Sequence, residues 1–596
     1  MLELRNVSLL APRAAGTWLL RGISMQFPPA HLCAVVGPSG CGKSTLLKVI
    51  AGIRAPDEGT VHWEGRDLEE QDLDPHEIGY VPQFSIAFDQ LTVAETIETA
   101  FRLRVGGLSD DERAERGARI MADVGLTEIA DRRVRVLSGG QKRRLALAIE
   151  VVSSPVLLLC DEVTSGLDPK AETEIVRLLR QLAGGGEEAA LEKTEPHVAR
   201  TVLSVTHSLR HLQLHDSVAV LYQGRLVFHG PPLLLPHYFS IVNPEGLFPR
   251  LSTRSAKGWH DSWQKHRAAY HAALHDDEQK VPRAEDEPIE AETRVESRES
   301  SAAKTLDPRP STLDPPSFAT QFLTLLARRW RIFFRDGGHL ALHLALLFGF
   351  PFLVVIFAWD GLPQIQNLTS SGNVVQQLLE SAAFALQSSR IASLVSGLVM
   401  FQVILLTLMG SNNSAREIAG ERAIFEKEKF AGVRASAYVA SKVVFLAALV
   451  LAQSVWMAVF INTICRFPGD LLAQITMLVL VNAAMTAVCL GLSSVMKTAE
   501  HASLVCVYLV GFQLPLSGAV LALPHVIGGL TRPFIASYWA WSGYLQTMRD
   551  TRFYDVVQSV SQTELSAFEL CGWVLCSHIA GGILLAYLGS KHSRWD

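Results

Sequence analysis

Six long apolar segments lie in the second half of this 596-residue chain. Each approaches the ~20 residues that an α-helix needs to cross the apolar core of a bilayer. A buried soluble core is the alternative, but six such segments in one half of a chain make it a poor one. We therefore expect residues 339–596 to form an all-α, polytopic membrane domain of six transmembrane helices. The segments are Leu340–Trp359, Ile391–Met409, Val443–Ile464, Leu471–Leu492, Ala502–Leu523 and Leu570–Gly589.

Basic residues are distributed unevenly around these segments. The stretch 317–338 is basic and amphipathic, which is typical of a connecting helix at a membrane face. The loop 411–442 is also basic, whereas 360–389 contains no Lys or Arg. Because basic loops stay in the cytoplasm, this pattern predicts cytoplasmic termini and an integral, multi-pass protein of a plasma or bacterial inner membrane. The N-terminus has no apolar segment that indicates a cleaved signal.

The first 250 residues have a different pattern. Strand-like runs at 31–37, 155–161 and 200–207 alternate with helical patterns such as 111–126, which indicates an α/β domain. Residues 251–316 are expected to be a charged, largely disordered linker, since 276–316 hold too little apolar surface to offset the entropy of ordering. A solvated spacer is the simpler reading, and a docking or phosphorylation segment is the other. The net charge of -5 gives no general case for a nucleic-acid partner.

A phosphate-binding loop, GPSGCGKST, follows the first of these strands and opens a helix. It matches G-x-x-x-x-G-K-[ST] in full, a pattern in which glycines let backbone N–H groups surround phosphates. Lys43 supplies a positive charge to the β- and γ-phosphates, and the Ser44 hydroxyl is a Mg²⁺ ligand. The expected nucleotide-binding residues of this loop are Gly37, Pro38, Ser39, Gly40, Cys41, Gly42, Lys43, Ser44 and Thr45.

A second glycine-rich turn, LSGGQKRR at 137–144, opens another helix, and a carboxylate pair follows it. Asp161 and Glu162 end an apolar strand, where isolated acids are usually only solvated or cap a helix. Beside a phosphate loop, Asp161 is expected to hold the Mg²⁺ hydration shell and Glu162 to polarise the attacking water. Taken singly, Gln83 would be a surface residue, Asp168 a turn residue and His207 a structural histidine.

Together, these motifs and their order resemble the complete set of an ABC ATPase. The resemblance implies ATP and Mg²⁺ as cofactors and a P-loop α/β fold. It also implies that Gln83 senses Mg²⁺ and couples to the membrane part, and that Asp168 lies at a dimer contact. His207 would contact the γ-phosphate. In that family the signature loop closes over ATP held by a second subunit, so Ser138, Gly139, Gly140 and Gln141 would complete the partner's site.

The domain order resembles the G (White) subfamily of half-transporters, and so do residues 224–240, 317–336 and the coupling-helix region 420–442. There are departures. Val163 stands where the subfamily usually has Pro, Gln141 where it usually has Glu, and 524–569 contain no cysteine for outer disulfides. The aromatic residue that stacks on adenine is ambiguous. Trp18 is the nearest candidate, although the motif position falls nearer Leu10.

The apolar spans contain few charges, which favours an apolar or amphipathic cargo, such as a lipid, a sterol-like compound or a hydrophobic drug. We therefore expect a homodimer of half-transporters that exports such a molecule by hydrolysing ATP. Two alternatives remain: a polysaccharide-type or other ABC-2 exporter, and a mechanical coupler to an outer partner without its own cargo.

By resemblance, the cargo would meet the second and fifth spans of both chains. An outer valve would lie at 517–520, where Ala519 and Val520 are small, or at Leu521. Asn367 begins a glycosylation sequon on the outer side, and His343 is read as a helix-packing residue. The alternative for each candidate lining residue is lipid contact or helix packing. The candidates are Phe401, Gln402, Met409, Phe512 and Gln513.

Overall fold

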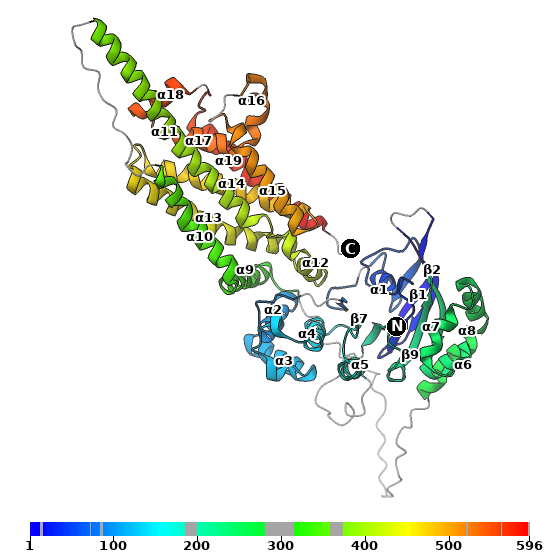
Figure 1. Ribbon diagram of the computed structural model, residues 1–596. Helices are drawn as coiled ribbons and strands as arrows, with labels where there is room; N and C mark the ends of the chain where they lie inside the picture. Colours follow the sequence, from blue (N-terminus) through cyan, green and yellow to red (C-terminus); the bar gives the residue numbers. More distant parts are fainter. Residues whose placement is uncertain are drawn as a thin grey trace, which may run out of the picture. The chain divides into compact units, whose positions relative to one another are not determined.

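The computed structural model describes the chain except residues 12–15, 72, 84–86, 185–199, 280–314, 358–373, 520–522, 562 and 594–596. Asn367, Val520, Leu521 and most of the predicted disordered stretch therefore lie outside the described residues. The chain divides into two compact units, with the main boundary between Ser317 and Phe318. Each unit is described by itself (Figure 1).

The first unit contains a six-stranded sheet in the order β10-β9-β3-β8-β7-β6. Strands β6, β7, β8, β3 and β9 run parallel, and β10 pairs antiparallel with β9. The central strands read LCAVV, LLLCD and TVLSV and are buried along their whole length, as expected for a parallel sheet covered on both faces. The bounds are β3 Leu32–Val36, β6 Ile78–Val81, β7 Leu157–Asp161, β8 Thr201–Val205, β9 Ser217–Tyr222 and β10 Arg225–Gly230.

A second, antiparallel sheet in the order β2-β1-β4-β5 lies in the same unit. Its strands are β1 Leu2–Leu10, β2 Trp18–Phe27, β4 Glu58–Trp63 and β5 Arg66–Asp67. The helices of the unit are α1 Lys43–Ile50, α2 Val93–Arg104, α3 Asp110–Asp123, α4 Gly139–Val151, α5 Pro169–Leu182, α6 Leu235–Phe239, α7 Leu247–Leu251 and α8 Ala256–Gln279. The strands and the helix expected from the sequence in this region are thus confirmed.

Helix α8 occupies part of the segment that the sequence assigned to the linker. Trp263 is 1% exposed, and its ring lies 5.4 Å from that of Phe228 on β10. His260 Nδ1 hydrogen-bonds with the carbonyl of Leu226, also on β10, at 2.9 Å. Two buried tryptophans in an otherwise charged segment supply the apolar surface that fixes it. The folded nucleotide domain therefore extends past residue 250, and the start of the linker was placed too early.

The second unit consists of helices. They are α9 Phe318–Arg335, α10 Gly337–Ile356, α11 Val374–Ser414, α12 Arg422–Phe430, α13 Ala435–Cys465, α14 Leu471–Val495, α15 Ala499–Gln513, α16 His525–Thr531, α17 Ala536–Gln546, α18 Arg552–Val560 and α19 Phe568–His592. Among the described residues, α10, α11, α13, α14 and α19 contain stretches long and apolar enough to cross a membrane.

The fifth expected span, Ala502–Leu523, is shorter than the sequence predicts. Helix α15 has 15 residues and ends at Gln513, before Pro515 opens a 3₁₀ turn. At a rise of ~1.5 Å per residue it is about 22 Å long, less than the ~30 Å of a bilayer core. Proline cannot continue the backbone hydrogen bonding, so the apolar run does not continue as one helix.

Small residues bring α14 and α19 close together. A Cβ atom on Gly582 would lie 2.4 Å from the carbonyl carbon of Ala487, and one on Gly589 would lie 2.2 Å from Ser494 Oγ. Ser494 Oγ also donates a hydrogen bond to the carbonyl of Leu585. Close backbone approach at small residues is the usual means of packing helices in lipid. In Figure 1, α11, α13, α14 and α19 form the body of this unit.

Candidate functional site

The phosphate loop between β3 and α1 requires glycine at two positions for different reasons. Gly42 has φ 102°, which favours glycine, and a Cβ atom there would lie 2.9 Å from the carbonyl oxygen of Leu19. A Cβ atom on Gly37 would lie 2.2 Å from the carbonyl oxygen of Leu221. The loop is therefore held against the backbones of β2 and β9, and it follows a strand and opens a helix as the motif predicted.

Lys43 is buried beneath this loop. Its ammonium group donates hydrogen bonds to the carbonyl oxygens of Gly37 at 2.9 Å and Pro38 at 3.1 Å. The side chain is 4% exposed. Among the residues that the structure describes, the hydrogen-bond partners of Lys43 are carbonyl oxygens and not carboxylates. Its positive charge is therefore available to phosphate oxygens.

Ser44 and Asp161 meet at the carboxyl end of β7. Ser44 Oγ donates to Asp161 Oδ1 at 2.8 Å, and the Tyr80 hydroxyl donates to Asp161 Oδ2 at 3.4 Å. Burial raises the pKa of Asp161, and the hydrogen bond from Ser44 opposes this shift. A hydroxyl and a carboxylate beside a phosphate loop are oxygen donors of the kind that Mg²⁺ prefers. These residues therefore fit the ion.

Glu162 joins two other predicted residues. Gln83 Nε2 donates to Glu162 Oε2 at 2.7 Å, and His207 Nε2 hydrogen-bonds with Glu162 Oε1 at 2.8 Å. Gln83 follows β6, Glu162 follows β7 and His207 follows β8, three adjacent parallel strands. The three predicted catalytic residues thus converge because the carboxyl ends of their strands lie at one edge.

The signature turn caps α4. Ser138 is the N-cap and forms a reciprocal capping box with Gln141. A Cβ atom on Gly139 would lie 3.7 Å from Leu167, and one on Gly140 would lie 3.6 Å from Ala171. Both distances are ordinary van der Waals contacts. The fold of this single chain therefore does not demand glycine at either position.

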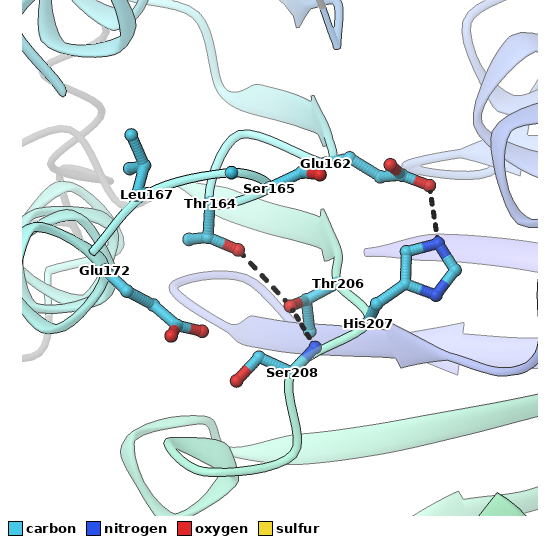
Figure 2. A pocket seen from close by; sticks show the side chains of 9 residues that line it. Glu162, Thr164, Ser165, Leu167, Glu172, Thr206, His207 and Ser208 are labelled. Carbon is cyan, nitrogen blue, oxygen red and sulfur yellow. Dashed lines mark hydrogen bonds and ion pairs between the residues drawn. The ribbon is translucent and has the colours of Figure 1, made fainter. Parts of the chain in front are cut away.

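A hollow of about 300 Å³ lies next to Glu162 and His207 (Figure 2). On its wall Thr164 Oγ1 and Thr206 Oγ1 are 3.3 Å apart, and Thr206 Oγ1 accepts the N–H of Ser208 at 3.1 Å. The lining residues are Glu162, Thr164, Ser165, Gly166, Leu167, Glu172, Thr206, His207 and Ser208.

The sequence did not single out Thr164, Thr206 or Tyr80, although each lies within three residues of a predicted site residue. Adjacency to those motifs was the signal that could have found them. Asp168 has a clear local role. Its carboxylate accepts the N–H groups of Lys170 and Ala171 as the N-cap of α5.

The two positions considered for adenine stacking are neighbours. Leu10 on β1 pairs directly with Trp18 on β2. The residue after Trp18, Leu19, places its carbonyl against Gly42 of the phosphate loop. Whether the stacking position falls at residue 10 or at residue 18, it lies at the same paired position of β1 and β2. Of the two residues, Trp18 is the aromatic one.

The expected cargo-lining residues do not form one surface on the single chain. Gln402 and Met409 are 0% exposed, and Gln513 is 1% exposed. Gln513 Oε1 accepts the N–H of Ser537 at the start of α17. Phe512 is 58% exposed, whereas the ring of Phe401 packs on Phe357. The Gln513 amide thus stabilises the start of a helix, which favours the helix-packing alternative for this residue.

Two families match the chain. Residues 20–165 match the ABC transporter family, and residues 320–544 match the ABC-2 type transporter family. The two matches follow one another in the order of the two structural units.

Curated relatives agree with this division. The ABC transporter ATP-binding/permease protein Rv1747 of Mycobacterium tuberculosis (strain ATCC 25618 / H37Rv) is 29% identical over 87% of this chain and 56% of its own length. The sulfate/thiosulfate import ATP-binding protein CysA of Vibrio vulnificus (strain CMCP6) is 35% identical over 36% of this chain and 59% of its own. The chain therefore spans less than two thirds of the length of either relative.

Part of the chain is similar to a solved ATP-binding cassette structure. The dimeric, post-hydrolysis ATP-binding cassette MJ0796, bound to ADP and Pi, is 27% identical, with a TM-score of 0.34. It covers 39% of this chain and 99% of its own.

Proposed function

Since the chain is an ABC transporter protein, with an ATP-hydrolysing ABC domain followed by an ABC-2 type membrane domain, we propose that it exports an apolar or amphipathic molecule. It acts as a dimer of half-transporters in a plasma or bacterial inner membrane, with both termini in the cytoplasm. ATP hydrolysis in the first unit drives the transport. The cargo is a lipid, a sterol-like compound or a hydrophobic drug.

The observation that carries this proposal is how few charged residues the described spans contain. The charged residues of α11 are Glu380 and Arg390, before the apolar run that starts at Ile391, and those of α19 are Glu569 and Lys591, near its two ends. Helices α10 and α14 contain no Asp, Glu, Lys or Arg, and α13 contains only Lys442. Lys442 is paired near the start of α13, where its ammonium donates to Glu417 at 2.9 Å. A charged cargo crossing such a bundle would lose its hydration without a compensating partner, which is costly in a bilayer core.

Three amide side chains inside the bundle, Asn413, Gln453 and Asn482, form a hydrogen-bonded cluster. Asn413 and Gln453 exchange two amide hydrogen bonds, at 2.8 and 3.0 Å. Asn482 donates to Gln453 at 3.2 Å and to Ser454 at 3.1 Å. This cluster joins α11, α13 and α14, so these amides support helix packing, and their hydrogen bonds are used within the bundle rather than on a hydrophilic cargo.

The hydrolytic chemistry follows from the first unit. Lys43 and the backbone of the phosphate loop bind the β- and γ-phosphates of ATP. Glu162 accepts a proton from the attacking water, while Gln83 and His207 orient the groups around it. Ser44, Asp161 and Gln83 would hold Mg²⁺, which neutralises charge on the phosphates when bound.

Dimerisation accounts for the second glycine turn. The glycines at 139 and 140 leave room for an incoming molecule, and α4 presents its positive N-terminus at Ser138. In a dimer this turn completes the nucleotide site of the partner, so each dimer has two shared sites. Asp168 and the loop before it then lie at the contact.

A vesicle assay with the full chain tests the proposal. The ATPase rate is measured in lipid vesicles with a panel of probes: a short-chain fluorescent phospholipid, a hydrophobic cationic dye, a sterol and a soluble oligosaccharide. We expect stimulation by at least one of the first three, and ATP-dependent movement of that probe, but none by the oligosaccharide. The Glu162→Gln chain serves as the control without hydrolysis. Stimulation by the oligosaccharide alone would contradict the proposed cargo class.

A further inference from the structure

Two side-chain links join the segment after β7 to the segment after β8. One is the contact between Glu162 and His207, at 2.8 Å. The other is the hydroxyl pair of Thr164 and Thr206, at 3.3 Å. Figure 2 shows them as separate interactions between the same two segments, with the hydroxyl pair on the wall of the hollow.

The two hydrogen bonds differ in whether they can persist during ATP hydrolysis. In the proposed mechanism, Glu162 turns to the attacking water and His207 to the γ-phosphate. Their contact uses the very atoms that these roles require, so it breaks when ATP is in place. The hydroxyls of Thr164 and Thr206 have no role toward the nucleotide, so their link can persist through the whole cycle.

The hydroxyl pair of Thr164 and Thr206 is buried, and a neighbouring backbone N–H orients it. Thr164 is 7% exposed and Thr206 is 6% exposed. Because Thr206 Oγ1 accepts the Ser208 N–H, its own hydrogen is available to Thr164 Oγ1, which orders the pair. A buried hydroxyl without a hydrogen-bond partner costs free energy of folding, so separating the two hydroxyls is unfavourable.

We propose that Thr164 and Thr206 are positioning residues that keep the Asp168 loop (residues 164–168) in register with His207 while the contact between Glu162 and His207 opens. Thr164 begins this loop, and Leu167 within it lies against Gly139 of the signature turn. Thr206 directly precedes His207. Movement of either segment is thereby passed to the other, and the inference rests on the catalytic roles proposed above.

Steady-state ATP hydrolysis by the full chain in lipid vesicles tests this inference. Thr164→Val has nearly the same shape but cannot hydrogen-bond. We expect it to lower kcat about three- to tenfold, the worth of one hydrogen bond at the transition state, with KM for ATP unchanged. Thr164→Ser restores the hydroxyl and should restore kcat.

Thr206→Val removes the same link and also leaves the Ser208 N–H without its acceptor, so its loss should be at least as large. The double valine variant should be no slower than Thr206→Val alone, since the link can be lost only once. Additive losses, a slow Thr164→Ser chain or a Thr164→Val chain with normal kcat would each overturn the inference.

Thr201→Val is the matched control. Thr201 begins β8, is 1% exposed and donates its hydroxyl to the carbonyl of Pro28 at 3.0 Å. This variant should lower the unfolding temperature without changing kcat, which separates positioning from stability. Glu162→Gln separates the two proposals. If it remains fully active, the catalytic roles are wrong, whereas an inactive Glu162→Gln beside a normal Thr164→Val refutes only the positioning pair.

Discussion

Replacing Glu162 with glutamine should separate folding and ATP binding from turnover. The substitution changes one carboxylate oxygen to an NH₂ group and keeps the shape of the side chain. Glu162 makes two hydrogen bonds, one from Gln83 Nε2 at 2.7 Å and one with His207 Nε2 at 2.8 Å. A glutamine can keep both if the Gln83 amide rotates to present its oxygen, because amide groups can be donors or acceptors.

The cost to stability is therefore that of exchanging charge-assisted hydrogen bonds for neutral ones, about 1 kcal/mol. Binding of ATP should be close to normal, since Lys43 and the phosphate loop are not altered. The rate of ATP hydrolysis, in contrast, depends on the carboxylate as a proton acceptor. An amide cannot accept the proton from water, so turnover should fall by about 10²–10⁴-fold, the contribution of a general base.

Phosphate release by the full chain in vesicles measures the rate, and a fluorescent ATP analogue measures binding. Glu172→Gln is the matched control, because Glu172 lines the same hollow and the change removes the same charge. We expect it to keep turnover within a factor of about two, because Glu172 lies on α5 and has no role in the proposed chemistry. Turnover above a tenth of wild type in Glu162→Gln, or an equal loss in Glu172→Gln, would refute the assignment of the base.

Three further outcomes are expected. Mixing inactive Lys43→Ala and Gly139→Asp chains should restore some ATPase activity, since a mixed dimer keeps one intact shared site, whereas sites confined to one chain would stay inactive. Arg104 donates two hydrogen bonds to Glu150, and both are 4% exposed or less; Glu150→Gln should destabilise the first unit by about 3–5 kcal/mol in denaturant unfolding, and an apolar replacement of both residues should recover most of it. Trp18→Ala should weaken ATP binding about five- to a hundredfold through lost base stacking, whereas Trp18→Phe should retain most of the affinity.

Local patterns were sufficient where one short segment defines the structure. The phosphate loop could be read directly, because a strand, a glycine turn and a helix start occur in consecutive residues. The apolar runs likewise indicated membrane helices, since length and hydropathy are local properties. The end of α15 at Gln513 was missed, although Pro515 gave a local signal for it. The two tryptophans at 259 and 263 similarly marked α8 as more than a linker.

By itself, the sequence determined the order of the units, the chemistry of the phosphate loop and the identity of Gln83, Glu162 and His207 as a set. It could do so because each motif carries its residue types at fixed spacing. Only the tertiary structure decided which atoms meet. Strand order brings residues 83, 162 and 207 to one edge and sets Thr164 against Thr206, and helix packing buries Gln402 and Gln513. Such contacts depend on which segments become neighbours in space, and residue spacing along the chain does not encode that directly.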